Sequence, residues 1–324
     1  MSTPTPIEKF DFSTAITQLF QTADGKAFAK RLWFWASAAY AGAMLLSLPF
    51  IVKYYPDLLE ANWHNMKAIV SGEAPDNTAL LTIFAKLLPS YLFLVVCILA
   101  IGAAVETALH KKVLFGEEEP RMPLRFGGLQ MRVLLAQLSV WFIWFVAYVL
   151  GVLVLVLFAG GLGAVSPILG GIIGLIGFVA LLCLLVFLPI SLAPAAALSV
   201  YRGRLQIMAA RKVSKGIFWN LLGAYLVVVI GGYILIYVVM SIGVIAVTGD
   251  TAFLEALSGL GKENPKIAFA EAAQRFKNPL VMFIGIVAIF TYAGAYAIYT
   301  LSISGVGSYA VKWWHGNDEA NQFD

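Results

Sequence analysis

The chain has 324 residues, of which 60% are hydrophobic and only 12% charged, and its mean hydropathy is +0.85. Soluble domains are nearer half apolar and a quarter charged, so this composition excludes an ordinary soluble domain. Apolar runs of twenty or more residues, separated by short polar segments, instead predict an all-α polytopic membrane protein. The net charge of +4 is modest, and its distribution along the chain is more informative than its size.

The N-terminal segment, residues 1–32, is polar and mixed in charge. From residue 10 to residue 31 its apolar side chains recur at helical spacing, with Asp11 or Ser13 available as N-cap. Gly25 can break this helix, and Lys26, Lys30 and Arg31 lie at its membrane end. We therefore predict an amphipathic interfacial helix in a cytoplasmic segment, and not a cleavable signal peptide.

Six apolar runs follow, and each is long enough to cross a membrane. We predict spans at about 33–52, 80–109, 131–158, 167–198, 218–247 and 280–311. A loop is expected at 53–78 and a short uncharged loop at 158–166. Together the spans form one transmembrane domain over residues 33–312, and residues 313–324 form a loose cytoplasmic tail.

Small residues and prolines mark two of these spans. Gly170, Gly171, Gly174 and Gly177 fall on one face of the fourth span, which suits close contact with another helix. Pro189 and Pro194 are expected to kink its far half. In the second span an interfacial turn is expected before Pro89.

Basic segments precede the third and fifth spans, and we call these segments elbows. In each, a helix leaves the membrane, a short piece lies on the surface, and the next helix enters. The second elbow covers residues 109–130 and the third covers 191–220. The N-terminal segment, which precedes the first span, is counted as the first of the three basic segments. The third elbow contains no acidic residue. The basic residues of interest are Lys111, Lys112, Arg125 and Arg132 in or just after the second elbow, and Arg202, Arg204, Arg211, Lys212 and Lys215 in the third.

The distribution of Lys and Arg predicts the orientation. Fifteen of the 22 lie in the N-terminal segment, in or next to the two elbows, and at residue 312, while seven lie in the intervening loops or within a span. The positive-inside rule therefore places both termini and both elbows in the cytoplasm, which requires an even number of spans. Three helical hairpins, each preceded by a basic interfacial segment, are one hypothesis for this pattern. Alternating basic loops that only set the topology are the other.

Charged side chains are essentially absent from the third to sixth spans. Glu106 lies near the cytoplasmic end of the second span, where Lys111, Lys112, Arg132 or Arg211 is expected to pair with it. A proton relay or an ion site is the alternative. Four hydroxyls on the fifth and sixth spans could line a polar groove, or could only pack and form interhelical hydrogen bonds. These belong to Tyr233, Tyr237, Tyr292 and Tyr296.

Motifs for catalysis or metal binding are absent from the sequence. Cys97 and Cys183 each lie within an apolar run and are expected to be buried hydrophobes. The three histidines are widely spaced. No phosphate-binding loop, nucleophile set or paired intramembrane carboxylates occur, so we expect no enzymatic activity, no cofactor, no metal and no nucleic-acid partner.

Two stretches carry a resemblance to a known group of proteins. They are LPISLAPAAALSVYRGRLQIMAARKVSKGIFWNLLGAY at 188–225 and LRFGGLQMRVLL at 124–135. In the first, an apolar helix with prolines leads into a basic segment and then into a new apolar run. This layout resembles polytopic inner-membrane proteins of proteobacteria without assigned function. It is more distantly similar to the membrane-domain family found fused to glycerophosphodiester phosphodiesterases. The resemblance implies no catalytic residue.

The sequence thus predicts a non-enzymatic protein of the bacterial inner membrane. Its expected role is lipid binding, or that of an accessory or scaffold component, carried by the basic cytoplasmic elbows. Anionic lipids are the preferred partner, with a second membrane protein possible. The alternative is a transporter or channel for a small or lipidic substrate, with a groove between the fifth and sixth spans.

Overall fold

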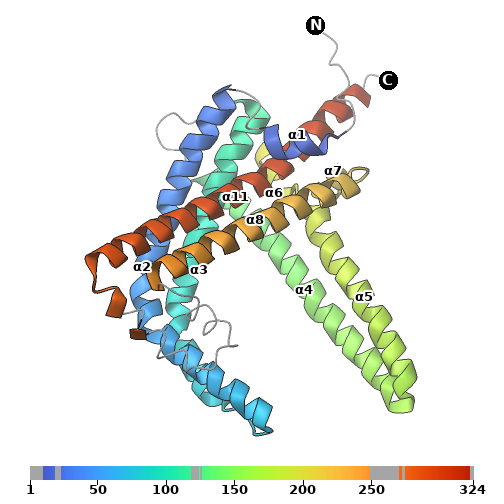
Figure 1. Cartoon of the computed structure of the whole chain (residues 1–324). Coiled ribbons are helices and arrows are strands. Elements are labelled where there is room, and N and C mark those ends of the chain that lie inside the picture. Colours follow the sequence, from blue (N-terminus) through green and yellow to red (C-terminus); the bar gives the residue numbers. More distant parts are fainter. Residues whose placement is uncertain are drawn as a thin grey trace. The chain divides into compact units, whose positions relative to one another are not determined.

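The computed structural model describes residues 10–18, 23–117, 124, 126–248, 270–271 and 274–321 (Figure 1). The helices are α1 (Phe12–Thr17), α2 (Ala23–Ser71), α3 (Asn77–Phe115), α4 (Gly128–Val165), α5 (Pro167–Leu192), α6 (Ala195–Tyr201), α7 (Ala210–Ser214), α8 (Phe218–Thr248) and α11 (Pro279–Asn321). No strand occurs in these ranges, and six helical stretches are long and apolar enough to cross a membrane. The predicted all-α polytopic fold is therefore confirmed.

The chain divides into two compact units. One contains residues 1–29, 103–229 and 301–324, and the other contains residues 30–102 and 230–300. The long helices α2, α3, α8 and α11 each contribute residues to both units. The first unit holds the third elbow and the described part of the second.

The N-terminal helices differ from the predicted interfacial helix at 10–31. Asp11 caps α1, since its carboxylate accepts hydrogen bonds from the backbone N–H groups of Ser13 and Thr14, both at 3.1 Å. A hydrogen bond from the Thr14 hydroxyl, with further bonds from Ser13, lowers the pKa of Asp11. α1 ends at Thr17, and α2 begins at residue 23 and runs through Gly25. Gly25 therefore does not break the helix, because a helix tolerates one glycine at a cost of about 1 kcal/mol.

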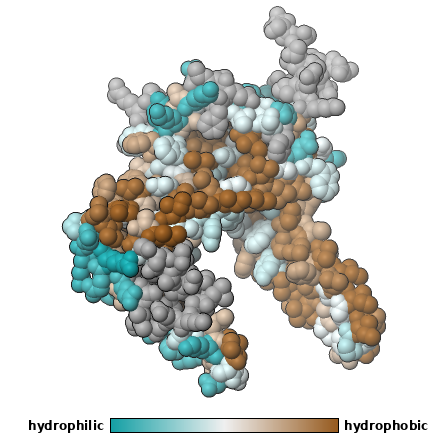
Figure 2. Space-filling view, in the orientation of Figure 1, coloured by the Kyte–Doolittle hydropathy of each residue, from teal (hydrophilic) through white to brown (hydrophobic). Residues whose placement is uncertain are grey.

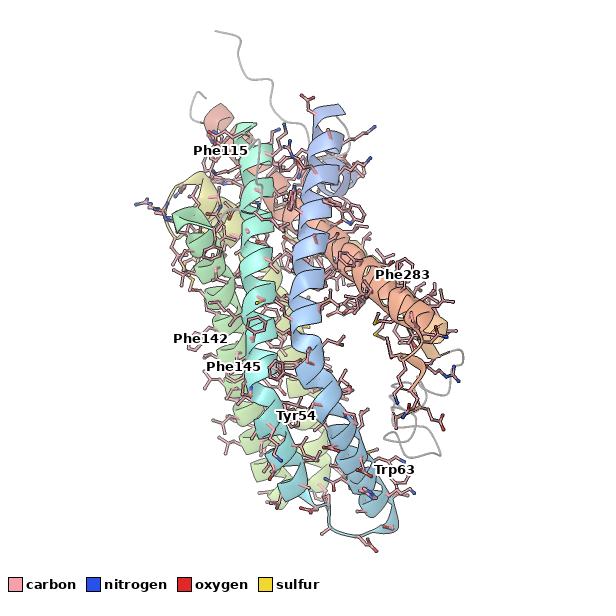
Figure 3. All side chains as sticks on the ribbon, turned by 90° about the vertical axis from the view of Figure 1, so that its left-hand side faces the viewer. Tyr54, Trp63, Phe115, Phe142, Phe145 and Phe283 are labelled. Atoms are coloured by element: carbon pink, nitrogen blue, oxygen red, sulfur yellow. The ribbon has the colours of Figure 1, made fainter. Side chains whose placement is uncertain are left out.

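α2 and α3 form a long helical hairpin in the second unit (Figure 3). The loop predicted at 53–78 is mostly helix, because α2 continues to residue 71. With 49 residues, α2 is about 74 Å long, more than twice the ~30 Å hydrocarbon core. Its polar second half, where Tyr54 and Trp63 lie, therefore extends beyond the hydrocarbon core. Lys67 covers the Trp63 ring there, with its Nζ 3.6 Å from the ring centroid.

Asn65 and Asp76 close this hairpin. The Asn65 side chain donates to the Asp76 carbonyl at 3.2 Å and accepts from the Asp76 N–H at 2.9 Å. The Asp76 carboxylate in turn accepts from the N–H of Thr78, at 3.0 Å, at the start of α3. α3 then runs without a break through Pro89, so the turn predicted before that proline does not occur.

α4 and α5 form a second hairpin, in the first unit, with Ser166 as its only non-helical residue (Figure 1). The loop predicted at 158–166 is thus reduced to one residue, followed by Pro167 at the first turn of α5. Apolar side chains cover the outside of this hairpin (Figure 2), and Phe142 and Phe145 are 67% and 57% exposed. Such side chains suit direct contact with lipid tails.

The glycine face predicted on the fourth span is confirmed at three of its four positions. A Cβ on Gly170 would lie 2.5 Å from the Gly163 Cα, and one on Gly177 would lie 2.6 Å from Leu155 Cδ1. Gly174 faces Ala159, and Gly171 faces open space. The backbones of α4 and α5 therefore approach closely, as small residues allow in membrane helices.

Trp144 on α4 stabilises α5 where Pro189 weakens it. Proline has no N–H, so the carbonyl four residues earlier, that of Leu185, loses its donor within the helix. The Trp144 indole N–H donates to this carbonyl at 3.0 Å. α5 consequently passes Pro189 and ends only at residue 192, before Pro194.

The Gly170→Ala substitution should destabilise the protein by about 1–3 kcal/mol, because its methyl group would meet the Gly163 backbone, which cannot rotate away. The measurement is thermal unfolding in mild detergent. Gly171→Ala is the matched control, because its methyl group would meet open space. Equal losses in the two variants would contradict the close contact of α4 with α5.

Trp144→Phe should cost about 1 kcal/mol of stability, because it leaves the Leu185 carbonyl without a donor. In a Pro189→Ala background the backbone N–H of residue 189 becomes available, so the same substitution should cost clearly less. Unfolding midpoints of the four proteins of this cycle measure the difference. An equal cost of Trp144→Phe in both backgrounds would show that the indole does not replace the missing N–H.

Candidate functional site

The third elbow is a folded structure in which short helices meet at buried serines. α5 ends at residue 192, which frees the carbonyl of Ser191, and the Ser214 hydroxyl of α7 donates to it at 2.9 Å. The Ser199 hydroxyl of α6 accepts the backbone N–H of Gln206 at 3.0 Å. Ser191, Ser199 and Ser214 are all buried. These bonds satisfy backbone groups that would otherwise be unpaired near the membrane.

Two glycines supply the turns of this elbow. Gly203 has φ = 63° and Gly216 has φ = 93°, a left-handed region that strains any residue with a Cβ. Gly203 follows α6, and Gly216 directs the chain from α7 into α8. The apolar side chains of Val200, Val213 and Ile217 are buried beneath.

The five basic side chains of the third elbow all point to the exterior. Arg202, Arg204, Arg211, Lys212 and Lys215 are exposed, and within the described part of the chain none of them forms an ion pair with a carboxylate. Leu205, Met208 and Trp219 are exposed beside them, by 43%, 70% and 78%. We call these eight side chains the elbow surface. Its mixture of cations, aliphatic groups and one tryptophan is typical of a membrane interface.

Arg132, just after the second elbow, contacts the third. Its guanidinium donates a hydrogen bond to the carbonyl of Gly203. Arg202 lies over the Trp314 ring, with its guanidinium carbon 5.5 Å from the centroid. Ala103, Val133 and Val200 pack together below, from α3, α4 and α6. The sequence predicted both elbows but not this junction.

The remaining basic residues of the second elbow are placed differently. Lys111 and Lys112 are half-buried, and the Lys112 ammonium lies 6.0 Å from the centroid of the Phe28 ring. Arg125 lies outside the described residues. Of the described second-elbow candidates, Arg132 is therefore the one that contacts the third elbow.

Tyr201, which sequence reasoning missed, joins the ends of three helices. Its ring stacks on Phe115 of α3, with centroids 6.0 Å apart and planes 8° from parallel. Its hydroxyl forms a 2.7 Å hydrogen bond with His315 Nε2 of α11. The available signal was an aromatic hydroxyl where an apolar run meets a basic segment. α11 extends to residue 321, so the predicted loose tail is helical up to that point.

Among the described residues, Glu106 meets polar groups of the first unit and forms no ion pair with a lysine or an arginine. Its carboxylate oxygen Oε2 lies 3.8 Å from His110 Nε2, one turn further along α3. Gln137 of α4 and Ser304 of α11 are its polar neighbours, and each has a group that can donate to the carboxylate. The pairing expected with Lys111, Lys112, Arg132 or Arg211 is thus replaced by neutral donors and a histidine.

The structure joins two of the four predicted tyrosines through Tyr299. The Tyr299 ring lies 6.2 Å from that of Tyr233 and 6.1 Å from that of Tyr296, centroid to centroid. Tyr233 and Tyr237 are 66% and 65% exposed, and Tyr292 is half-buried. Tyr296 packs edge-on against Tyr40 of α2, with centroids 4.9 Å apart. This arrangement suits helix packing and lipid contact better than a common polar groove.

α8 and α11 also approach closely within the second unit. A Cβ on Gly232 would lie 2.3 Å from Tyr299 Cδ2, and one on Gly243 would lie 3.1 Å from the Ala288 Cβ. Side chains of α11 therefore fill the space against α8 at these two levels. These contacts weigh against a substrate path between the two helices.

Metal-ligating groups do not gather in the described part of the chain. No three of its His, Cys, Asp and Glu side chains come together to hold an ion. Both cysteines are free thiols, Cys97 half-buried and Cys183 exposed. Exposure of Cys183 on α5 differs from the expected burial and suits contact with lipid.

Comparison of the chain with protein-family models, with curated proteins and with solved structures gives no match. The geometry of the elbow surface is therefore the main indication of function.

Gly216→Ala should destabilise the protein by about 1 kcal/mol or more, because alanine is strained at φ = 93° although the space around the residue is open. Gly231→Ala is the control, since that helical glycine also has open space and alanine favours a helix. Thermal unfolding in detergent measures both. A neutral Gly216→Ala would show that the elbow does not depend on this turn.

Proposed function

We propose that this chain is a non-enzymatic inner-membrane protein that binds anionic lipid headgroups through its basic elbows. The observation that carries the proposal is the elbow surface, in which five exposed cations lie beside Leu205, Met208 and Trp219. The cations suit a phosphate-bearing headgroup, and the apolar side chains suit the acyl boundary below it.

The position of the elbow supports a lipid as the ligand. The third elbow directly connects two stretches that are long and apolar enough to cross a membrane, 167–201 and 218–248. Its side chains are therefore held within reach of the headgroup layer. A basic residue near an anionic surface contributes roughly 1 kcal/mol, so five can contribute up to about 5 kcal/mol.

Contacts inside the first unit support the proposed topology, with both termini in the cytoplasm. Phe10 packs against Tyr309 and Trp313 of α11, with ring centroids 5.1 and 5.9 Å away. The Tyr201–His315 hydrogen bond ties the third elbow to the same end of α11. Both ends of the described chain and the third elbow are thus joined at the same end of α11. An even number of membrane crossings requires the two ends of the chain to lie on the same side. The positive-inside rule assigns that side to the cytoplasm.

The test is native mass spectrometry of the purified protein with added anionic and zwitterionic lipids. Replacing the five elbow cations by glutamine should reduce anionic lipid binding at least tenfold, because most of the electrostatic attraction is removed. Binding of zwitterionic lipid should change little. All five side chains are exposed, so the fold should tolerate the changes.

A matched variant removes five other exposed cations. These are Lys53, Lys67, Lys86, Arg275 and Lys277, which lie in α2, in α3 and before α11. Glutamine at these positions lowers the net charge equally but should leave anionic lipid binding nearly unchanged. If the two variants lose binding equally, only net charge matters and the elbow is not a site. If the elbow variant binds as the unchanged protein does, the proposal is wrong.

A further inference from the structure

A buried polar cluster in the first unit is not used by lipid binding at the elbow. Glu106 and His110 lie one turn apart on α3, facing Gln137 of α4 and Ser304 and Ser308 of α11. The His110 side chain is 2% exposed and that of Glu106 is 14% exposed. Ionisable groups inside membrane-spanning helices are costly, so they indicate a function by default.

Hydrogen bonds to Ser308 favour one protonation pattern of His110. The Ser308 hydroxyl donates its proton to the Ser304 carbonyl at 3.0 Å. The same hydroxyl oxygen lies 2.6 Å from His110 Nδ1, and both bonds form together only in the tautomer in which Nδ1 carries the hydrogen and donates it to Ser308. In neutral His110 the other ring nitrogen, Nε2, is consequently a bare acceptor.

That bare nitrogen faces the Glu106 carboxylate. The distance from Nε2 to Oε2 is 3.8 Å, and Nε2 is buried without a hydrogen-bond partner. The amide oxygen of Gln137 is a further buried acceptor without a partner. When no proton is bound between Glu106 and His110, two acceptors face each other. The negative charge of the Glu106 carboxylate then remains among the spanning helices.

We propose that Glu106 and His110 form an intramembrane site that binds one exchangeable proton. The proton comes from water and adds to a lone pair of Oε2 or of Nε2, and no bond in the protein breaks. Either position neutralises the pair and converts two facing acceptors into a donor and an acceptor. Slight rotation of the two side chains then brings the pair within hydrogen-bonding distance.

Few other groups can titrate near this site. From α8, Tyr225 interacts with the Glu106 carboxylate, and its hydroxyl lies over Gly307 of α11. From α4 and α11, Gln137 and Ser304 face the carboxylate, and neither titrates at ordinary pH. His110 is thus the one partner that can share the proton of Glu106 near neutral pH within the described part of the chain.

The first experiment follows thermal unfolding of the full chain in detergent from mildly acidic to alkaline pH. In the unchanged protein the midpoint should fall as pH rises and the proton leaves the pair. Glu106→Gln should abolish this pH-dependent fall, because its amide is neutral at every pH and can donate to His110 Nε2. Glu117→Gln removes an exposed carboxylate just after α3 and should keep the fall.

Spectroscopy of the unchanged protein tests the same site without relying on a variant that folds. Infrared difference spectra report a protonated carboxyl, and ¹⁵N NMR of labelled histidine reports a protonated imidazole. One of these signals should be present at neutral pH and should disappear at alkaline pH. Absence of both, or a pH-dependent fall that persists in Glu106→Gln, would overturn the proposal. Recovery of stability at alkaline pH on adding sodium would also overturn it, since a metal cation would then be the ligand.

Discussion

Satisfaction of backbone hydrogen bonds is the constraint on which this structure depends. In lipid no water pairs with a free N–H or carbonyl, so the chain stays helical wherever it crosses. At two points in the described part of the chain where a backbone carbonyl loses its helical partner, a side chain replaces that partner. The Trp144 indole pairs with the Leu185 carbonyl that Pro189 leaves free, and the Ser214 hydroxyl pairs with Ser191 where α5 ends. Because these substitutes are built in, the chain can fold a compact elbow between two spans and present its basic side chains on the exterior.

The sequence was sufficient for the fold class because hydrophobic runs report directly on membrane spans. It was poor at helix ends. Residues 53–71 are polar, and polarity excludes lipid contact but does not exclude helix, so α2 continues far beyond the predicted span. Gly25 and Pro89 mark weak points that the surrounding helix tolerates. The glycine face of α5 was predictable, because glycines at positions 170, 174 and 177 recur at helical spacing whatever their partner is.

The candidate site, too, could be predicted from the sequence only in part. Exposure of the five third-elbow cations follows from their charge, and the structure agrees with it. The contact of Arg132 with Gly203 and the Tyr201–His315 hydrogen bond join segments far apart in the chain, and no local pattern encodes them. The partner of Glu106 was mispredicted for a related reason: charge favoured a lysine or arginine, whereas packing of α3 against α4 and α11 supplied His110, Gln137 and Ser304. The resemblance to proteobacterial inner-membrane proteins stays a prediction.

The central claim is that the elbow surface lies in the headgroup layer of an anionic membrane. Electron paramagnetic resonance of a spin label at position 208, in a variant without Cys97 and Cys183, measures its depth directly in anionic nanodiscs. Labels at Leu157, which is 63% exposed on α4, and at the exposed Glu117 give the lipid and water references. The account predicts that the label at position 208 lies at a depth between these two references. It should collide with oxygen less often than the label at position 157, and with a water-soluble relaxant less often than the label at position 117. A label at 208 that is as open to water as the one at 117 would contradict it.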